Sequence, residues 1–258
     1  MYGGDEVSAV VIDMGSTCTK AGYAGEDSPK YVIPSSIGVL GGEDAASQER
    51  RPGTNALAVR ADGMRVTPAV TEGIVTDWDA AESILEHTYK SCLSVNAGDH
   101  PLHLAEANHN PSANREKMAE ICFEKLGVPA LFLSKCAVLT AFASGRGTAL
   151  VLDIGGGVTS ATAVHDGYVL RKSVKRHALA GDRISEMVCK SVQLRTPAPP
   201  LLPLYTLKRQ EIGPGEFTSS YVDYPGTHPT FHKYHLLNLF RDVKESACRC
   251  HMINPNEQ

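Results

Sequence analysis

Two short segments of the chain each place an acidic residue at the end of an apolar run, directly before a turn of small residues. In VVIDMGSTCTKAGY the apolar run ends near Asp13, and in LVLDIGGGVTSATAV it ends near Asp153. Small residues in such a turn let backbone N–H groups approach phosphate oxygens without a side-chain clash. A carboxylate at the strand end can hold a hydrated Mg²⁺ beside those phosphates. The chemistry indicated is binding of a phosphorylated ligand with its magnesium ion.

The repetition of this pattern matters more than either turn. A single strand–glycine–strand turn is usually an ordinary hairpin, and three glycines in a row are weak as a motif. Here both segments share an apolar strand, an aspartate, a tight turn and a threonine-bearing strand, and Lys20 adds a positive charge to the first. We therefore expect two phosphate-binding hairpins that face each other across a cleft.

Apolar runs, turn residues and helical spacing predict an α/β protein around these hairpins. Strands are predicted at 7–14, 17–24, 102–105, 130–133, 148–154, 158–164 and 168–174, and helices after Asp77, from Asn110 to Gly127, and at 135–143, 181–192 and 231–250. Residues 38–65 lack periodicity and predict a mobile surface loop. Residues 196–203 are rich in proline and break regular structure, and the last residues, MINPNEQ, are expected to be unstructured.

Composition narrows the class of protein. The 258 residues carry a formal net charge of −4 and are 42% hydrophobic, which is typical of a soluble globular protein. This mild acidity gives no bulk attraction to DNA or to an anionic membrane. The seven scattered cysteines favour a reducing compartment, cytosol or nucleus. No apolar run is long enough to span a bilayer, and the start lacks the basic residues of a signal peptide.

Longer segments around both turns resemble actin and follow one another in the actin order. They are IDMGSTCTKAGYAGEDSPK, EGIVTDWDAAESILEHTY, NPSANREKMAEICFEKLGVPALFLSKCAVLTAFASGR, LVLDIGGGVTSATAVHDGY and RDVKESACR. The chain is therefore identified as a member of the actin family over roughly residues 5–190 and 238–250. The resemblance implies the α/β actin-like ATPase (ribonuclease H-like) fold with two related halves. These would be residues 1–135, with a small outer lobe around 35–68, and residues 136–258, a second half left incomplete.

The resemblance also implies a site for ATP and Mg²⁺. The β- and γ-phosphates would meet Gly15, Ser16, Thr17 and Lys20, and the opposing loop would consist of Gly155, Gly156, Gly157, Val158 and Thr159. Asp13 and Asp153 would hold Mg²⁺ through water. Gly181 would line the cleft, Lys244 would pack on the base, and Glu245 would bond the ribose.

Within the family, the MYGGDEVSA start, AGYAGED and VHDGYVL resemble the nuclear actin-related proteins called actin-like six in animals and actin-related protein four in yeast and plants. This implies a nuclear scaffold subunit of SWI/SNF-type and INO80-type remodelling complexes and of NuA4-type histone acetyltransferase complexes. Such a subunit pairs with actin on a helical segment of the motor or scaffold subunit. It would reach chromatin indirectly, through these partners, and no membrane would be involved.

Departures from actin predict binding without efficient hydrolysis. Actin has glutamine at the position of Cys136, histidine at Ser160 and an acidic residue at Gly156, and the first two help to orient the attacking water. Phosphoanhydride cleavage needs that water in line, so we expect no enzyme activity comparable with that of filamentous actin. The segment from Leu40 to Arg65 does not resemble the loop that actin inserts into its neighbour, so we expect no self-polymerisation.

The family pattern continues past RDVKESACR, whereas this sequence ends at MINPNEQ, which predicts a C-terminal truncation with an incomplete adenosine site and exposed apolar surface. Weak nucleotide affinity and poor solubility are expected from this. Two other functions stay open at this point. One is an actin-like ATPase that forms cytoskeletal filaments, and the other is a small-molecule kinase of the wider superfamily, for which we find no catalytic base.

Overall fold

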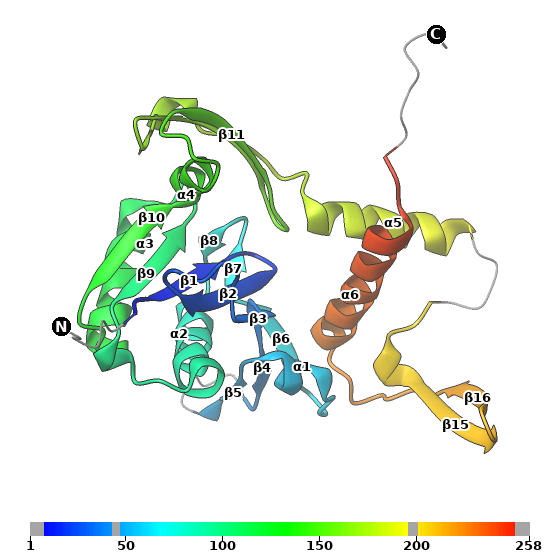
Figure 1. The fold of residues 1–258 in the computed structure, drawn as a ribbon. Coiled ribbons are helices and arrows are strands. Elements are labelled where there is room, and N and C mark those ends of the chain that lie inside the picture. Colours follow the sequence, from blue (N-terminus) through cyan, green and yellow to red (C-terminus); the bar gives the residue numbers. More distant parts are fainter. Residues whose placement is uncertain (1–7, 43–46, 196–200, 251–258) are drawn as a thin grey trace, which may run out of the picture.

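The computed structural model describes residues 8–42, 47–195 and 201–250. It contains two main β-sheets, each next to helices, a small lobe of short strands, a pair of helices and a hairpin (Figure 1). The turns that carry the repeated pattern lie at the ends of strands in the two main sheets.

The first sheet has the order β10-β9-β1-β2-β3. Its strands are β1 (Val10–Met14), β2 (Cys18–Tyr23), β3 (Tyr31–Pro34), β9 (Leu102–Glu106) and β10 (Leu131–Lys135). Alternate residues of β1 are buried, and β1 runs antiparallel to β2 but parallel to β9. Because parallel neighbours need a long crossover, the helical segments 78–93 and 112–126, which precede β9 and β10, pack on this sheet.

Two helical segments supply the rest of this core. Helix α2 (Trp78–His87) runs on through 88–93, and α3 (Ser112–Glu120) runs on through 121–126. As predicted, α2 begins after Asp77, whose side chain accepts a hydrogen bond from the N–H of Ala80 at 3.0 Å. The second helix ends at Gly127, whose φ of 71° lies in the left-handed region.

The second sheet contains β11 (Ala149–Ile154), β12 (Thr159–His165), β13 (Tyr168–Val169) and β14 (Lys175–His177). Helix α4 (Cys136–Ala143) covers one face of it. The predicted strand 168–174 was too long, since β13 ends at Val169 and residues 171–173 form a 3-10 turn. The reason is that the hydroxyl of Ser173 accepts the hydrogen bond of the Ala163 N–H at 3.0 Å, in place of a strand carbonyl.

For the described residues, 38–42 and 47–65, the prediction of a mobile loop was wrong. This segment lies in a lobe made of β4 (Ser36–Leu40), β5 (Glu49–Arg51), α1 (Thr54–Ala58) and β6 (Arg65–Pro68). Leu57 and Met64 are fully buried there, against Phe231 from near the other end of the chain. The elements are too short to show periodicity, and their core is completed by a distant residue, so the local sequence gave no signal of it.

The remaining elements follow the second sheet. Helices α5 (Gly181–Arg195) and α6 (Pro229–Ala247) pack on each other, and α6 also packs on the lobe (Figure 1). Between them in sequence lies the hairpin of β15 (Leu207–Gly213) and β16 (Glu216–Tyr221), which was not predicted. Short strands β7 (Val70–Thr71) and β8 (Ile74–Val75) pair after the lobe. The expectations for 196–200 and for 252–258 fall outside the described residues.

Within the described part of the chain, none of the helices combines the length and apolar character that crossing a membrane requires.

Candidate phosphate-binding site

The two predicted hairpins share one turn geometry. In the first, the N–H of Gly15 donates to the carbonyl of Cys18 at 3.1 Å, and in the second the N–H of Gly155 donates to the carbonyl of Val158 at 3.0 Å. Both turns connect antiparallel strands, β1 to β2 and β11 to β12. The repeat seen in the sequence is therefore a repeat in backbone hydrogen bonding.

The carboxylates of Asp13 and Asp153 both raise the pKa of two neighbouring side chains, Lys20 and Cys136. Lys20 Nζ lies 3.1 Å from a carboxylate oxygen of Asp13. Partial burial alone lowers the pKa of Lys20, but contact with Asp13 and the nearby charge of Asp153 raise it overall. Burial first, and then these same two carboxylates, raise the pKa of the Cys136 thiol to about 12. The negative charges of Asp13 and Asp153, one from each hairpin, therefore both favour the protonated forms of Lys20 and Cys136.

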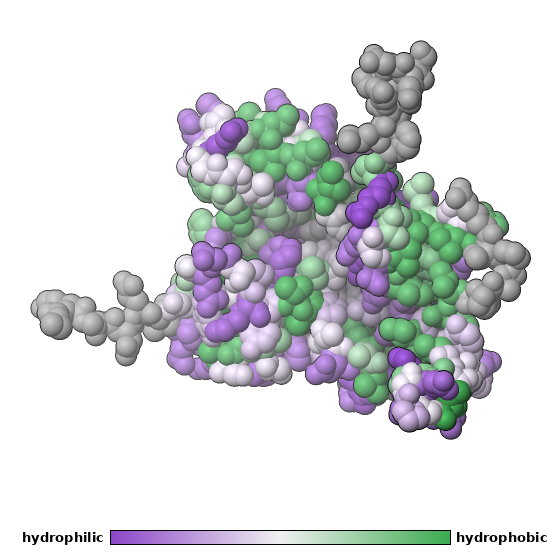
Figure 2. Space-filling view, turned by 45° about the vertical axis from the view of Figure 1, so that its right-hand side comes forward, coloured by the Kyte–Doolittle hydropathy of each residue, from purple (hydrophilic) through white to green (hydrophobic). Residues whose placement is uncertain are grey.

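A cavity of about 400 Å³ joins the hairpins, a volume suited to a small-molecule ligand. The surface is hollowed in the middle of the molecule (Figure 2). Ten residues predicted for the site line the cavity: Asp13, Gly15, Ser16, Thr17, Lys20, Asp153, Gly155, Gly156, Gly157 and Val158. Cys136 and Ser160, at which the sequence departs from actin, line it too.

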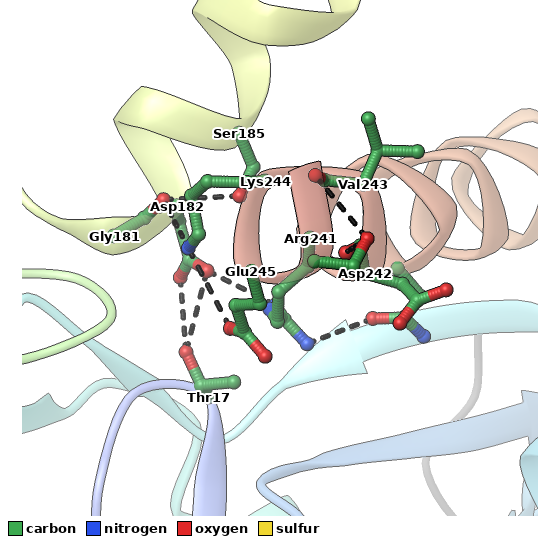
Figure 3. A network of polar contacts seen from close by, with 11 residues as sticks. Thr17, Gly181, Asp182, Ser185, Arg241, Asp242, Val243, Lys244 and Glu245 are labelled. Carbon is green, nitrogen blue, oxygen red and sulfur yellow. Dashed lines mark hydrogen bonds and ion pairs between the residues drawn. The ribbon is translucent and has the colours of Figure 1, made fainter. Parts of the chain in front are cut away.

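Four other predicted site residues, Thr159, Gly181, Lys244 and Glu245, lie beside the residues that line this cavity and not among them. That Gly181 lines a nucleotide cleft stays a prediction. The hydroxyl of Thr159 donates to the carbonyl of Leu179 at 2.6 Å, and Gly181 accepts from Lys244 Nζ at 3.2 Å. The N–H of Gly181 also donates to the carbonyl of Gly155 at 3.0 Å, which fastens the second hairpin to the start of α5. The bond from Lys244 joins α6 to the same point (Figure 3). Glu245, beside Lys244, has a side chain that is 65% exposed. That Lys244 and Glu245 meet an adenosine stays a prediction.

The glycines of the second hairpin are required by the first hairpin. A Cβ on Gly156 would overlap the hydroxyl oxygen of Thr17, and a Cβ on Gly157 would lie 2.6 Å from that of Ser16. None of these residues has a positive φ, so close approach and not backbone conformation excludes a side chain. The tips of the two hairpins are in direct contact.

Two charged residues at this contact were not predicted. Asp182, in the first turn of α5, accepts from the hydroxyl of Thr17 at 3.2 Å and from Arg241 on α6 at 3.0 Å (Figure 3). An aspartate at a helix start is an ordinary stabilising choice, so Asp182 gave no functional signal. Its pairing with a residue 59 positions away requires the tertiary structure.

A polar wall at the β9 end of the cavity was also missed. The Glu106 side chain, 6% exposed, lies between Lys135 Nζ at 3.0 Å and Arg115 Nε at 3.1 Å. His109 Nε2–H donates to the carbonyl of Glu72 at 3.1 Å, and its Nδ1 is buried without a partner among the described residues. Burial lowers the pKa of His109, which favours the neutral imidazole.

These residues fit a phosphate ligand with Mg²⁺. Mg²⁺ in proteins is usually held by one or two carboxylates, with phosphate and water completing its shell. Asp13 and Asp153 supply two carboxylates in one cavity, and Lys20 supplies a cation for phosphate. In the described residues no group of three or more His, Cys, Asp or Glu side chains could hold a metal without such a ligand.

Comparison with known proteins places the chain in a family. The sequence profile described as Actin matches residues 4–258. Proteins named actin-related protein 4 from Arabidopsis thaliana and from Oryza sativa subsp. japonica are each 42% identical to it, and the one from Schizosaccharomyces pombe is 33% identical. The alignments cover 96%, 96% and 95% of this chain, but 62%, 62% and 55% of the relatives. The chain thus spans about three fifths of the length of the curated relatives it matches. With its mixed α/β architecture and its paired hairpins, the chain belongs to the actin family.

Proposed function

We propose that this protein binds ATP with Mg²⁺ and acts as a scaffold subunit, not as a catalyst. The observation that carries the binding is the cavity in which two like hairpins bring Asp13 and Asp153 together beside Lys20. In this proposal the backbone of both turns and Lys20 hold the phosphates. The two carboxylates hold the magnesium ion, which neutralises phosphate charge when bound.

We expect the protein to bind ATP without hydrolysing it efficiently. The Cys136 thiol stays protonated at neutral pH and hydrogen-bonds only weakly, and the short Ser160 side chain is buried. Neither replaces the long polar side chains with which actin orients water.

Binding is tested by titrating purified protein with MgATP. Asp13→Asn and Asp153→Asn each remove one carboxylate, and we expect each to weaken Mg²⁺-dependent binding at least about tenfold. Asp166→Asn is the matched control, because Asp166 lies in the exposed turn between β12 and β13. Equal affinities for all four proteins would overturn the assignment of this cavity. Phosphate release near the rate of filamentous actin would overturn the non-catalytic part.

For partners, we propose the class to which the relatives named actin-related protein 4 point. The chain would then be a non-polymerising subunit of nuclear chromatin-remodelling and histone acetyltransferase complexes. It would pair there with actin on a helical segment of a motor or scaffold subunit and act in transcription regulation.

Affinity purification with mass spectrometry tests this assignment. Recovery of actin together with a remodelling motor supports it. Recovery of filament-binding proteins, with pelleting of the pure protein in Mg²⁺ and salt, would favour the cytoskeletal alternative.

A further inference from the structure

A polar network ties the first hairpin to the two helices on the other side of the cavity. The Thr17 hydroxyl lies 3.3 and 3.2 Å from the two carboxylate oxygens of Asp182, and Arg241 donates to one of them at 3.0 Å (Figure 3). Thr17 is 165 positions from Asp182, so the contact joins distant parts of the chain. The side chains of Asp182 and Arg241 are only 36% and 30% exposed, which limits screening by water.

The same contact closes the space between the hairpin tips. A Cβ on Gly156 would overlap the Thr17 hydroxyl oxygen, and a Cβ on Gly157 would lie 2.6 Å from the Ser16 hydroxyl oxygen. Ser16 is itself held, because its hydroxyl accepts from the N–H of Gly73 at 2.8 Å. A phosphate group cannot lie between these tips unless they separate.

A phosphate would also compete with Asp182 for both of its partners. It accepts hydrogen bonds from hydroxyl and guanidinium groups, as the carboxylate does, and the two anions repel each other at this distance. We propose that Thr17, Asp182 and Arg241 form a latch that holds the hairpins together and that an entering phosphate must displace. Asp182 is then a positioning residue that sets the affinity of the site. The identity of the ligand rests on the proposed function, whereas the latch itself does not.

The latch is tested with two variants that weaken it by different routes. Thr17→Ala removes the hydroxyl and leaves Asp182 paired with Arg241, whereas Asp182→Asn removes the charge and keeps the shape. With MgATP as the probe, we expect Asp182→Asn to bind about tenfold more tightly than the unmodified protein, since a hydrogen bond to a charged group shifts an equilibrium by that order. Thr17→Ala loses a hydrogen bond to the phosphate as well as the one to Asp182, so its affinity should stay within about threefold of the unmodified value. Asp166→Asn, distant from the cavity, should bind like the unmodified protein.

Hydrogen–deuterium exchange on the ligand-free proteins gives a readout independent of nucleotide. The N–H of Asp182 donates to the carbonyl of Gly156 at 2.8 Å, and that of Gly73 donates to Ser16, so both amides report on the closed hairpins. We expect these amides to exchange several times faster in Thr17→Ala and Asp182→Asn but not in Asp166→Asn.

The possible results separate the two claims. If none of the proteins binds MgATP but both latch variants exchange faster, the latch stands and the nucleotide assignment fails. If the unmodified protein binds MgATP while Asp182→Asn binds no more tightly and neither latch variant exchanges faster, the latch is refuted and the nucleotide assignment stands.

Discussion

Position 156, in the second hairpin, has room only for glycine, because one atom of the first hairpin occupies the space that a side chain would need. Its φ is not positive, so an alanine could adopt its backbone conformation. The obstacle is the hydroxyl oxygen of Thr17. Threonine is β-branched and therefore stiff at χ1, and Asp182 holds this hydroxyl in place by accepting its hydrogen bond. Three consecutive glycines are weak as a sequence motif, but the contact gives two of them, Gly156 and Gly157, a steric reason.

We predict that Gly156→Ala lowers the free energy of unfolding by about 1–3 kcal/mol, the usual cost of overpacking. In a Thr17→Ala background the same substitution should cost less, because the overlapping oxygen is gone. Urea unfolding of both single variants and of the double variant completes the cycle. Independent, additive effects of the two substitutions would contradict the contact.

At the scale of elements, helix α6 is joined to the lobe that contains β4, β5 and β6. His235 Nε2–H donates to the carbonyl of Leu57 at 2.9 Å, and the centroids of the His235 and Phe231 rings lie 4.4 Å apart. Thr230 accepts from the N–H of Val66 at 2.9 Å. Since these partners are separated by more than 160 positions, the lobe and α6 stabilise each other.

This joint should weaken in acid. Burial lowers the pKa of His235, and nearby His232 lowers it further, while the bond to Leu57 acts in the opposite sense. At a pH above the ordinary pKa of 6.5 the His235 imidazole is neutral in both the folded and the unfolded chain, so its contribution to the free energy of unfolding is fully present. As the pH falls below that value, the unfolded chain takes up a proton that the folded protein resists, so stability is lost.

We predict that His235→Gln, which keeps an N–H donor but does not titrate, loses less stability between pH 7 and pH 5.5 than the unmodified protein does. The dependence of the free energy of unfolding on pH should become weaker in this variant but not disappear, because burial also lowers the pKa of His87, His103 and His109. His165→Gln is the control, since His165 is 65% exposed. Urea midpoints at the two pH values measure the effect, and identical slopes for all three proteins would rule it out.

The elements also show where sequence patterns suffice. The hairpins around Asp13 and Asp153 were predictable, because apolar runs and glycine turns are local signals that the sequence repeats. The resemblance to actin implied an outer lobe around 35–68, but the strands and the helix inside it were not predictable, since Leu57 and Met64 acquire a core only when Phe231 packs on them. The same holds for the site, in which Asp182 is placed beside Thr17 by tertiary structure alone.

Across the whole molecule, one apolar face is left uncovered in the part that the structure describes. On β11 the residues Leu150, Leu152 and Ile154 are 78%, 65% and 64% exposed. They point to one face, because side chains alternate along a strand, whereas Val151 points to the other and packs on α4. Apolar side chains gather on the surface at the top of Figure 2, in the region of this sheet. Among the described residues β11 pairs only with β12, so its other edge is open as well.

An open edge beside an apolar face favours association between chains, which gives a physical basis for the expected poor solubility. We predict that Leu152→Lys lowers self-association at micromolar concentration and changes the free energy of unfolding by no more than about 0.5 kcal/mol, as exposed substitutions usually do. Val151→Lys is the matched comparison on the same strand. It buries an unpaired ammonium group against α4 and should unfold the second sheet. Sedimentation velocity and thermal unfolding distinguish the two variants. If Leu152→Lys associates as strongly as the unmodified chain while remaining folded, this face does not drive the association.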